Sequence, residues 1–175
     1  MTEILSRKAK KAYNAGKFDK AAALFQEAQA EYEMAGDELN AAEMANNKSV
    51  ALLQGGNPQK SYEAALGTDL IFKKHADILR QAMALGNQAA ALEEMGDLQQ
   101  ALFLYQEASS LLKDSEHKEI RSIILKSISV LQIKTGDQLK SLASMQAALD
   151  ESPKLNMRER ILKKVLNTPF KMMKK

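Results

Sequence analysis

A glycine-centred turn recurs every forty residues along this chain. The glycines occupy positions 16, 56, 96 and 136, and the residues after them are Lys17, Asn57, Asp97 and Asp137. A glycine just past a helix end adopts the left-handed conformation without Cβ strain, and an Asn or Asp after it can cap the free amides of the next helix. Pro58 also favours a helix start, because its missing N–H needs no partner in a first turn. Each turn therefore predicts the corner of a helical hairpin.

Three further columns of the same forty-residue alignment contain only small residues. They are Ala9, Ser49, Ala89 and Ser129 before the turn, then Ala21, Ser61, Ala101 and Ser141, and then Ala28, Thr68, Ala108 and Ala148. Two helices approach closely only where no long side chain separates their axes, so these columns predict helix crossings. Apolar filling between the columns comes from Phe25, Tyr105 and Met145. In the second repeat we expect the smaller Ala65 to be compensated by Leu66, Leu70, Ile71 and Phe72.

The composition favours helices over strands, because the 175 residues include only three prolines, eight glycines and 5% aromatics. The sequence predicts an all-α protein. The turns and the apolar periodicity predict helix pairs at 2–15 and 18–35, 38–54 and 58–74, 76–95 and 98–113, and 118–135 and 138–150.

The turns and the small-residue columns together resemble the tetratricopeptide repeat, which has small residues at matching positions and a Gly-Asp-like turn between its two helices. The period of forty is similar to the long-helix repeats of kinesin light chains. The resemblance implies a right-handed α-α superhelix, a solenoid of four helical hairpins at about 1–36, 37–76, 77–116 and 117–151, plus a C-terminal capping helix. HEAT or armadillo repeats have similar periods, but the small-residue columns beside the turn favour the tetratricopeptide interpretation.

A ninth helix is predicted in residues 152–167, followed by a basic tail in residues 168–175. Asn156 and Glu159 have the spacing of a capping box, and one apolar stripe is formed by Met157, Ile161, Leu162, Val165 and Leu166. A solenoid needs a terminal helix to cover its last exposed face, so we expect this stripe to act as a cap. The segment 152–175 carries a net charge of +7, whereas the whole chain carries +3.

The sequence offers no set of residues for catalysis, and we predict neither an enzyme nor a bound cofactor or metal. There is no cysteine, and neither His75 nor His117 has a second ligand one helical turn away. No nucleophile is paired with a base. The N-terminal residues lack the continuous apolar run of a secretory signal, and no stretch approaches the roughly 18 apolar residues of a membrane span. These features predict a cytoplasmic protein.

A binding groove is the better functional prediction, because the first helices of such hairpins line a concave surface suited to a peptide or a partner's helix. The position nine residues before each turn glycine, which the resemblance places in the groove, holds Arg7, Asn47, Asn87 and Ser127. An asparagine amide offers a donor and an acceptor together, so it can hold the backbone of an extended peptide. The other candidate groove residues are Lys10, Tyr13, Asn14, Asn46, Glu94, Lys126 and Lys134.

The sequence therefore predicts a protein–protein interaction scaffold or adaptor with a protein or peptide partner and no small-molecule substrate. The alternative is electrostatic docking of the basic C-terminal segment on an acidic protein surface, an anionic membrane or nucleic acid. Nucleic acid is the least favoured of these, since the tail offers no aromatic stacking platform beyond Phe170. The residues predicted to carry this docking are Lys163, Lys164, Lys171, Lys174 and Lys175.

Overall fold

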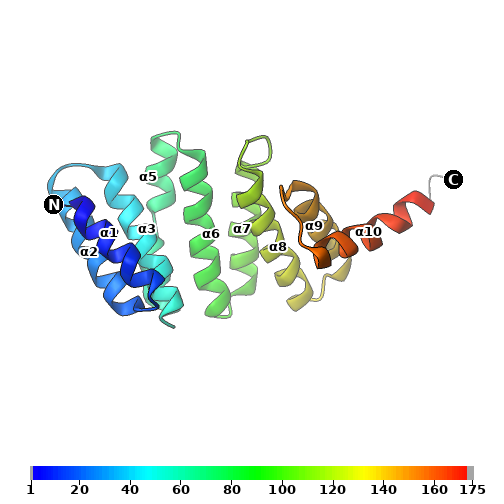
Figure 1. The fold of residues 1–175 in the computed structure, drawn as a ribbon, viewed down its shortest axis with the longest axis horizontal. Helices are drawn as coiled ribbons and strands as arrows, with labels where there is room; N and C mark the ends of the chain where they lie inside the picture. Colours follow the sequence, from blue (N-terminus) through cyan, green and yellow to red (C-terminus); the bar gives the residue numbers. More distant parts are fainter. Residues whose placement is uncertain (1, 173–175) are drawn as a thin grey trace. The chain divides into compact units, whose positions relative to one another are not determined.

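The computed structural model describes residues 2–172, with side chains for residues 2–167, and every regular element in that range is a helix (Figure 1). The helices are α1 (Thr2–Asn14), α2 (Phe18–Met34), α3 (Glu38–Gln54), α4 (Pro58–Ala65), α5 (Thr68–Lys74), α6 (Ile78–Glu94), α7 (Leu98–Leu111), α8 (Lys118–Lys134), α9 (Gln138–Glu151) and α10 (Met157–Met172). The chain forms two compact units, and the first ends at Leu104 within α7 while the second begins at Tyr105. The all-α prediction is confirmed. The predicted boundaries agree with these helices to within two residues, except at 58–74 and in the C-terminal helix.

The four predicted turns have the same backbone hydrogen bonds. Each glycine has a positive φ, between 70° and 86°, and its N–H donates to the carbonyl three residues earlier at 2.9 to 3.1 Å. The N–H of the following residue donates to the carbonyl five residues before it, as from Lys17 to Ala12 at 3.0 Å and from Asp137 to Gln132 at 2.7 Å. This pattern closes a helix end with a residue in the left-handed conformation. The prediction of four equivalent turns is confirmed.

Capping by the residue after the glycine is confirmed in two of the turns and wrong in another. Asp97 and Asp137 accept from the backbone N–H groups of Gln100 and Lys140, at 3.2 and 3.3 Å. The Asn57 side chain instead turns back and donates to the carbonyl of Gly55 at 3.1 Å, so it does not cap α4. Aspartates also cap α3 and α6, through Asp37 and Asp77 at 3.1 and 2.9 Å.

All twelve residues of the small columns are buried, and none is more than 4% exposed. Their side chains meet across the hairpins: the hydroxyl oxygens of Ser49 and Ser61 are 3.1 Å apart, and those of Ser129 and Ser141 are 2.9 Å apart. These contacts join the first and second helices of one hairpin, α3 with α4 and α8 with α9. The columns therefore mark helix crossings, as predicted.

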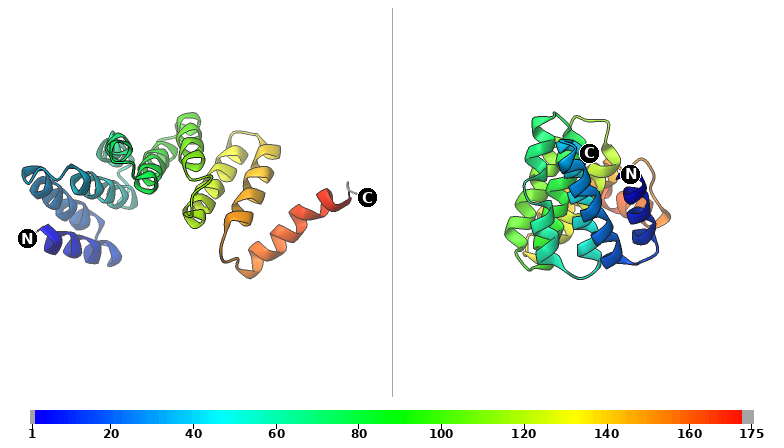
Figure 2. Two further views of the ribbon diagram at one scale, coloured as in Figure 1. Left: turned by 90° about the horizontal axis from the view of Figure 1, so that it is seen from above. Right: turned by 90° about the vertical axis from the view of Figure 1, so that its left-hand side faces the viewer.

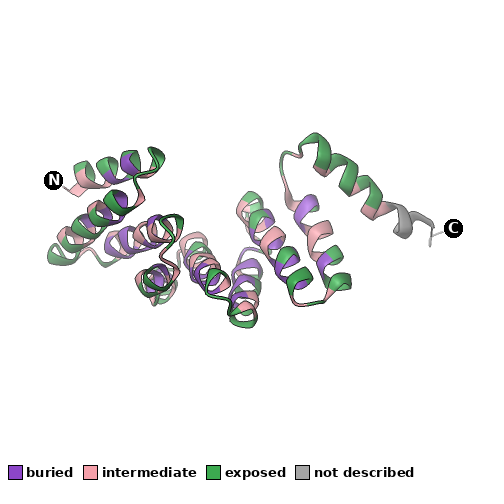
Figure 3. Cartoon of the chain, turned by 90° about the horizontal axis from the view of Figure 1, so that it is seen from below, coloured by how far each residue is buried: buried purple, intermediate pink, exposed green. Residues whose placement is uncertain are grey.

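Each unit has its own buried apolar side chains. In the first unit, α1, α2 and α3 pack around Phe25 and Met44, both 3% exposed, together with the column alanines. In the second unit, Leu131 and Leu149 are fully buried. Figure 3 shows the buried residues of α8 and α9 on the sides where these two helices face each other. Burial of one such large side chain stabilises a fold by about 1.5 to 3 kcal/mol.

The predicted continuous helix 58–74 is wrong, because the chain leaves the helical path at Leu66 and Gly67. Gly67 has a φ of 81°, which separates α4 from α5. At this break the buried carbonyl of Ala65 accepts hydrogen bonds from two side chains. The donors are Thr68 Oγ1 at 2.7 Å and Gln88 Nε2 at 3.2 Å. Phe72 of the short α5 is fully buried and packs with Ala42 of α3 and Ala84 of α6.

The expected compensation for Ala65 is therefore only partly right. Phe72 is buried and Ile71 is half-buried, but Leu66 and Leu70 are 59% and 63% exposed. The two leucines are mostly exposed and therefore contribute little to the core.

The C-terminal helix α10 is longer than predicted and packs differently. It continues to Met172, so there is no boundary between a capping helix and a tail at residue 168. The capping box is confirmed: the Asn156 N–H donates to Glu159 Oε2 at 2.9 Å, and the Glu159 N–H donates to Asn156 Oδ1 at 3.0 Å. Figure 2 shows that α10 diverges from α9 after its first turns.

The apolar stripe of α10 does not cover the end of the second unit as expected. Met157, Ile161 and Val165 are 80%, 59% and 60% exposed, and Leu162 is 38% exposed. In Figure 3 the described part of this helix is coloured mostly as exposed, with intermediate residues between. Leu166 is half-buried, but the rest of the apolar side of α10 faces solvent.

Candidate partner-binding surface

Four of the predicted groove residues line one hollow in the first unit. Lys10, Tyr13 and Asn14 come from α1 and Asn47 comes from α3, while Phe25 and Val50 complete the lining of a cavity of about 190 Å³. Tyr13 and Asn14 lie three and four positions after Lys10, so the three residues share one face of α1. We call this cavity the α1–α3 hollow.

The aromatic side chains hold the α1–α3 hollow in place. The rings of Tyr13 and Phe18 meet edge to face with centroids 5.6 Å apart, and Phe25 belongs to the buried core. An aromatic pair of this geometry contributes about 0.5 to 1.5 kcal/mol beyond its buried area. The polar groups Lys10, Asn14 and Asn47 therefore surround a rigid apolar base.

Asn46 and Asn87 bind each other. Asn87 Nδ2 donates to Asn46 Oδ1 at 2.8 Å, which joins α3 to α6. Asn46 is only 7% exposed, so the expectation that it faces a partner is wrong: its amide is part of the interior. Asn87 is half-buried, and one of its donor hydrogens is already used.

The remaining candidates of the first unit lie outside the hollow. Arg7 is exposed on α1, and Glu94 is exposed as the last residue of α6. Neither lines the α1–α3 hollow.

The candidates on α8 lie in the second unit, and Lys126 is bound to α10. Lys126 Nζ lies 2.6 Å from Glu159 Oε1 of α10, which lowers the pKa of the Glu159 carboxyl together with the N–H of Asn156. Ser127 is half-buried and Lys134 is exposed at the end of α8.

The basic residues predicted for C-terminal docking are only partly described. Lys163 is engaged: its Nζ donates to the carbonyl of Leu149 at 3.0 Å and lies 2.7 Å from Asp150 Oδ1. Lys164 is exposed. The Lys171 side chain, and Lys174 and Lys175 entirely, lie outside the described residues.

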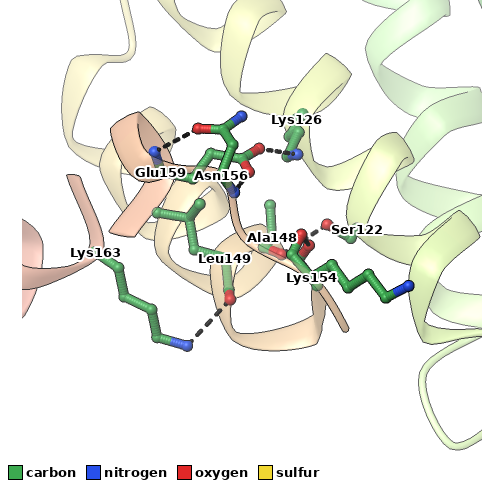
Figure 4. Close-up of polar contacts among 9 residues, drawn as sticks. Ser122, Lys126, Ala148, Leu149, Lys154, Asn156, Glu159 and Lys163 are labelled. Carbon is green, nitrogen blue, oxygen red and sulfur yellow. Dashed lines mark hydrogen bonds and ion pairs between the residues drawn. The ribbon is translucent and has the colours of Figure 1, made fainter. Parts of the chain in front are cut away.

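The side of α10 that meets the protein is polar (Figure 4). Lys126 reaches Glu159 from α8, and Lys163 reaches back to the last turns of α9. The ion pair with Lys163 lowers the pKa of the Asp150 carboxyl. This polar attachment, with the apolar stripe on the other side, reverses the usual orientation of an amphipathic helix.

The sequence interpretation missed a larger hollow of about 590 Å³ between α2 and α4–α5. Its floor is formed by Ala41, Ala42 and Ala45 of α3, and Lys48 reaches across it to donate to Gln29 Oε1 at 3.0 Å. Burial lowers the pKa of the Lys48 ammonium, and the Glu33 carboxylate opposes that shift. The sequence signal for this hollow was Gly67, which separates α4 from α5 and lines the cavity.

Two further kinds of site were sought in the described part of the chain. It contains no cluster of three or more His, Asp or Glu side chains that could hold a metal ion. None of its helices combines the length and apolarity needed to cross a bilayer.

Comparisons with known proteins establish the fold. No protein-family model matches the sequence, and no curated protein matches it. Among solved structures, the chain is similar to BtubC (BKLC) from P. vanneervenii, a kinesin light chain-like tetratricopeptide protein, with a TM-score of 0.74 at 18% sequence identity. The match covers 95% of this chain, which spans 65% of the BtubC chain. The chain therefore has the tetratricopeptide-like helical-repeat fold.

Proposed function

We propose that this chain is a non-catalytic scaffold that binds a peptide or helix of a partner protein across α1 and α3. The single observation that carries the proposal is the α1–α3 hollow, which gathers Lys10, Tyr13, Asn14 and Asn47 around one apolar base. Extended surfaces on the first helices of stacked hairpins suit the capture of other chains.

The chemistry of the hollow fits an extended segment with an acidic residue near it. The Asn14 and Asn47 amides can each donate to and accept from a peptide backbone. The Lys10 ammonium favours a carboxylate, and Tyr13 with Phe25 offers apolar contact to a neighbouring side chain.

The test is selection of binding peptides from a displayed random library, followed by affinity measurements on variants. Asn14→Ala with Asn47→Ala should weaken a selected peptide at least tenfold with little change in melting temperature. Gln26→Ala, which removes an exposed amide on α2, is the matched control. Peptides that bind the double variant as tightly as the wild type would remove the hollow from the proposal. Asn87→Ala is unsuitable, because it also breaks the internal bond to Asn46.

A second candidate is electrostatic docking of α10 on an acidic surface, and the reversed orientation of this helix favours it. The exposed stripe of Met157, Ile161 and Val165 is flanked by Arg158 and Lys164. A basic helix with an exposed apolar side is suited to an anionic membrane or an acidic protein groove.

The second candidate is tested by cosedimentation with vesicles that contain phosphatidylserine, at 50 and 300 mM salt. Binding should fall steeply with salt, and it should fall again in the Ile161→Asn, Val165→Asn variant. Vesicles of phosphatidylcholine alone are the control. Equal binding to both vesicle types would contradict an electrostatic mode.

A further inference from the structure

The first hairpin carries a second hollow, on the side of α1 that faces away from the α1–α3 hollow. Its volume is about 450 Å³, and it is lined by Lys8, Lys11, Ala12 and Ala15 of α1, and by Lys17, Lys20 and Leu24 at the start of α2. Lys8, Lys11 and Ala15 recur at helical spacing, as do Lys17, Lys20 and Leu24. At 3.6 residues per turn, the lysine face of α1 lies opposite the face that carries Lys10, Tyr13 and Asn14. We call this cavity the lysine hollow.

The lysine hollow has an apolar base and a purely cationic rim. Ala12 is 7% exposed and Leu24 is half-buried, whereas all four lysines are exposed. No carboxylate lines the cavity. Within residues 2–167, none of the four ammonium groups has an ion pair. Four like charges around one cavity repel each other, and a multivalent anion would relieve that repulsion.

The other hairpins lack this arrangement. The position of Lys11 is occupied forty, eighty and one hundred and twenty residues later by Ala51, Ala91 and Leu131, all fully buried. The position of Lys17 is occupied by Asn57, Asp97 and Asp137. The four cations therefore occur together only in the first hairpin, where the outer side of α1 and α2 is open.

A solvated helix face would account for polar residues here, but not for their uniform sign. Acidic, basic and amide side chains are all stable on an exposed face. Here every charged group at the rim is a lysine. An ammonium group is a compact point charge that binds phosphate oxygens.

We propose that the lysine hollow binds a small solute, or a lipid headgroup, that carries two or more phosphate groups. A cavity of about 450 Å³ falls within the range of small-molecule sites, roughly 300 to 1,000 Å³. The site is separate from the α1–α3 hollow, so partner binding and phosphate binding can fail independently.

The first experiment titrates tripolyphosphate into the full chain, followed by amide NMR and calorimetry at low salt. The expected result is saturable binding at one site, with shifts concentrated in residues 8–24. Lys11→Gln with Lys17→Gln should weaken binding at least tenfold. The matched control is Lys60→Gln with Lys140→Gln, which changes the residues equivalent to Lys20 in two other hairpins. It should leave binding within twofold of the wild type.

A second arm distinguishes the source of the phosphates. Vesicles that contain phosphatidylinositol bisphosphate are compared with vesicles that contain phosphatidylserine at equal charge. Binding of tripolyphosphate alone indicates a free solute, and preferential binding of the first vesicles indicates a headgroup. The proposal is overturned if neither probe binds, if tripolyphosphate shifts spread over the whole chain without saturation, or if both double variants weaken binding equally.

Discussion

Pairs of small residues lie buried between the two helices of each hairpin, and two kinds of pair alternate along the chain. The first and third hairpins use alanines at both positions, as in Ala9 with Ala21. The second and fourth use serines whose hydroxyl groups are hydrogen-bonded while buried. The serine pairs fit the same space as alanines only because each hydroxyl satisfies the other.

The serine pair of the second hairpin predicts non-additive stability changes. Ser61→Ala alone leaves the buried Ser49 hydroxyl without its partner, so it should reduce the free energy of unfolding by about 1 kcal/mol. Ser49→Ala with Ser61→Ala should cost less than the sum of the single changes, because the first hairpin already uses alanines at these positions. Urea denaturation of the four proteins in this cycle measures the coupling. Strictly additive losses would show that the hydroxyls do not interact.

Ala76 adopts a conformation that favours glycine. Its φ is 56°, and it forms the same turn bonds as Gly36, forty residues earlier. A left-handed alanine costs about 1 to 2 kcal/mol, whereas glycine adds about 0.4 to 1 kcal/mol of unfolded-state entropy. Ala76→Gly should therefore raise the melting temperature by a few degrees. Ala35→Gly, at a helical position with φ of −81°, should not raise it. If Ala76→Gly lowers the melting temperature, the left-handed backbone of Ala76 is not strained.

Gln88 stabilises the break between α4 and α5. Its Nε2 donates to the Ala65 carbonyl and to Asp69 Oδ1, the latter at 2.8 Å, and the side chain is only 4% exposed. Gln88→Ala should reduce the free energy of unfolding by about 1 to 3 kcal/mol, since it leaves buried acceptors with fewer donors. Gln81 lies on the same helix but is half-buried. Gln81→Ala should reduce the free energy of unfolding by less than about 0.5 kcal/mol. Chemical denaturation of both variants checks the difference, and equal losses would rule out this role.

At the scale of single elements, α10 shows what an amphipathic pattern specifies and what it does not. The spacing of Asn156 and Glu159 predicted the capping box, because both hydrogen bonds lie within one helical turn. The same spacing argument grouped Met157, Ile161 and Val165 on one face. It could not say which way that face points, since this depends on contacts of Glu159 and Lys163 with α8 and α9.

Acid should loosen the attachment of α10. The ion pairs lower the pKa values of Glu159 and Asp150 below their ordinary values. A lowered carboxyl pKa contributes stability that is complete above the ordinary value and is lost as the pH falls through the lowered one. The attachment should therefore persist at neutral pH and weaken below about pH 4.

Fluorescence energy transfer between labels on α9 and α10, recorded from pH 7 to pH 3, measures this release. Glu159→Gln should reduce the transfer already at pH 7 and flatten the titration. A wild-type signal that is unchanged down to pH 3 would show that the ion pairs do not hold the helix.

At the scale of the whole molecule, most of the architecture could be predicted from the sequence because its signals are local. A glycine with a positive φ marks a turn at its own position, and a buried small residue marks a helix crossing at its own position. The forty-residue columns therefore located both the turns and the crossings. The break at Gly67 was missed because the Ala65 carbonyl beside it is bound by Gln88, which is twenty-three residues from Ala65 in the sequence.

In the candidate site, too, the contact between distant helices was the part that could not be predicted. The resemblance placed Lys10, Tyr13, Asn14 and Asn47 in the groove by counting from the turn glycines, and all four line the α1–α3 hollow. The bond between Asn46 and Asn87 was not predictable, because it requires the register of α3 against α6.

Damage to one hairpin should remain local, since each repeat of such a fold contacts mainly its neighbours. Leu131 is fully buried in α8. Leu131→Ala should reduce the free energy of unfolding of its own hairpin by about 2 to 5 kcal/mol. Hydrogen exchange followed by mass spectrometry should show faster exchange in α8 and α9, with α1 to α3 close to the wild type. Uniform acceleration along the chain would indicate a single cooperative unit instead.

The buried serine pairs join residues only twelve positions apart, and this spacing bears on how the chain is made. Closing a loop of about ten residues takes roughly 10 to 100 ns, whereas a ribosome adds about 5 to 20 residues per second. Each hairpin can therefore close while the next is still being synthesised, so the nascent chain keeps little apolar surface open to aggregation.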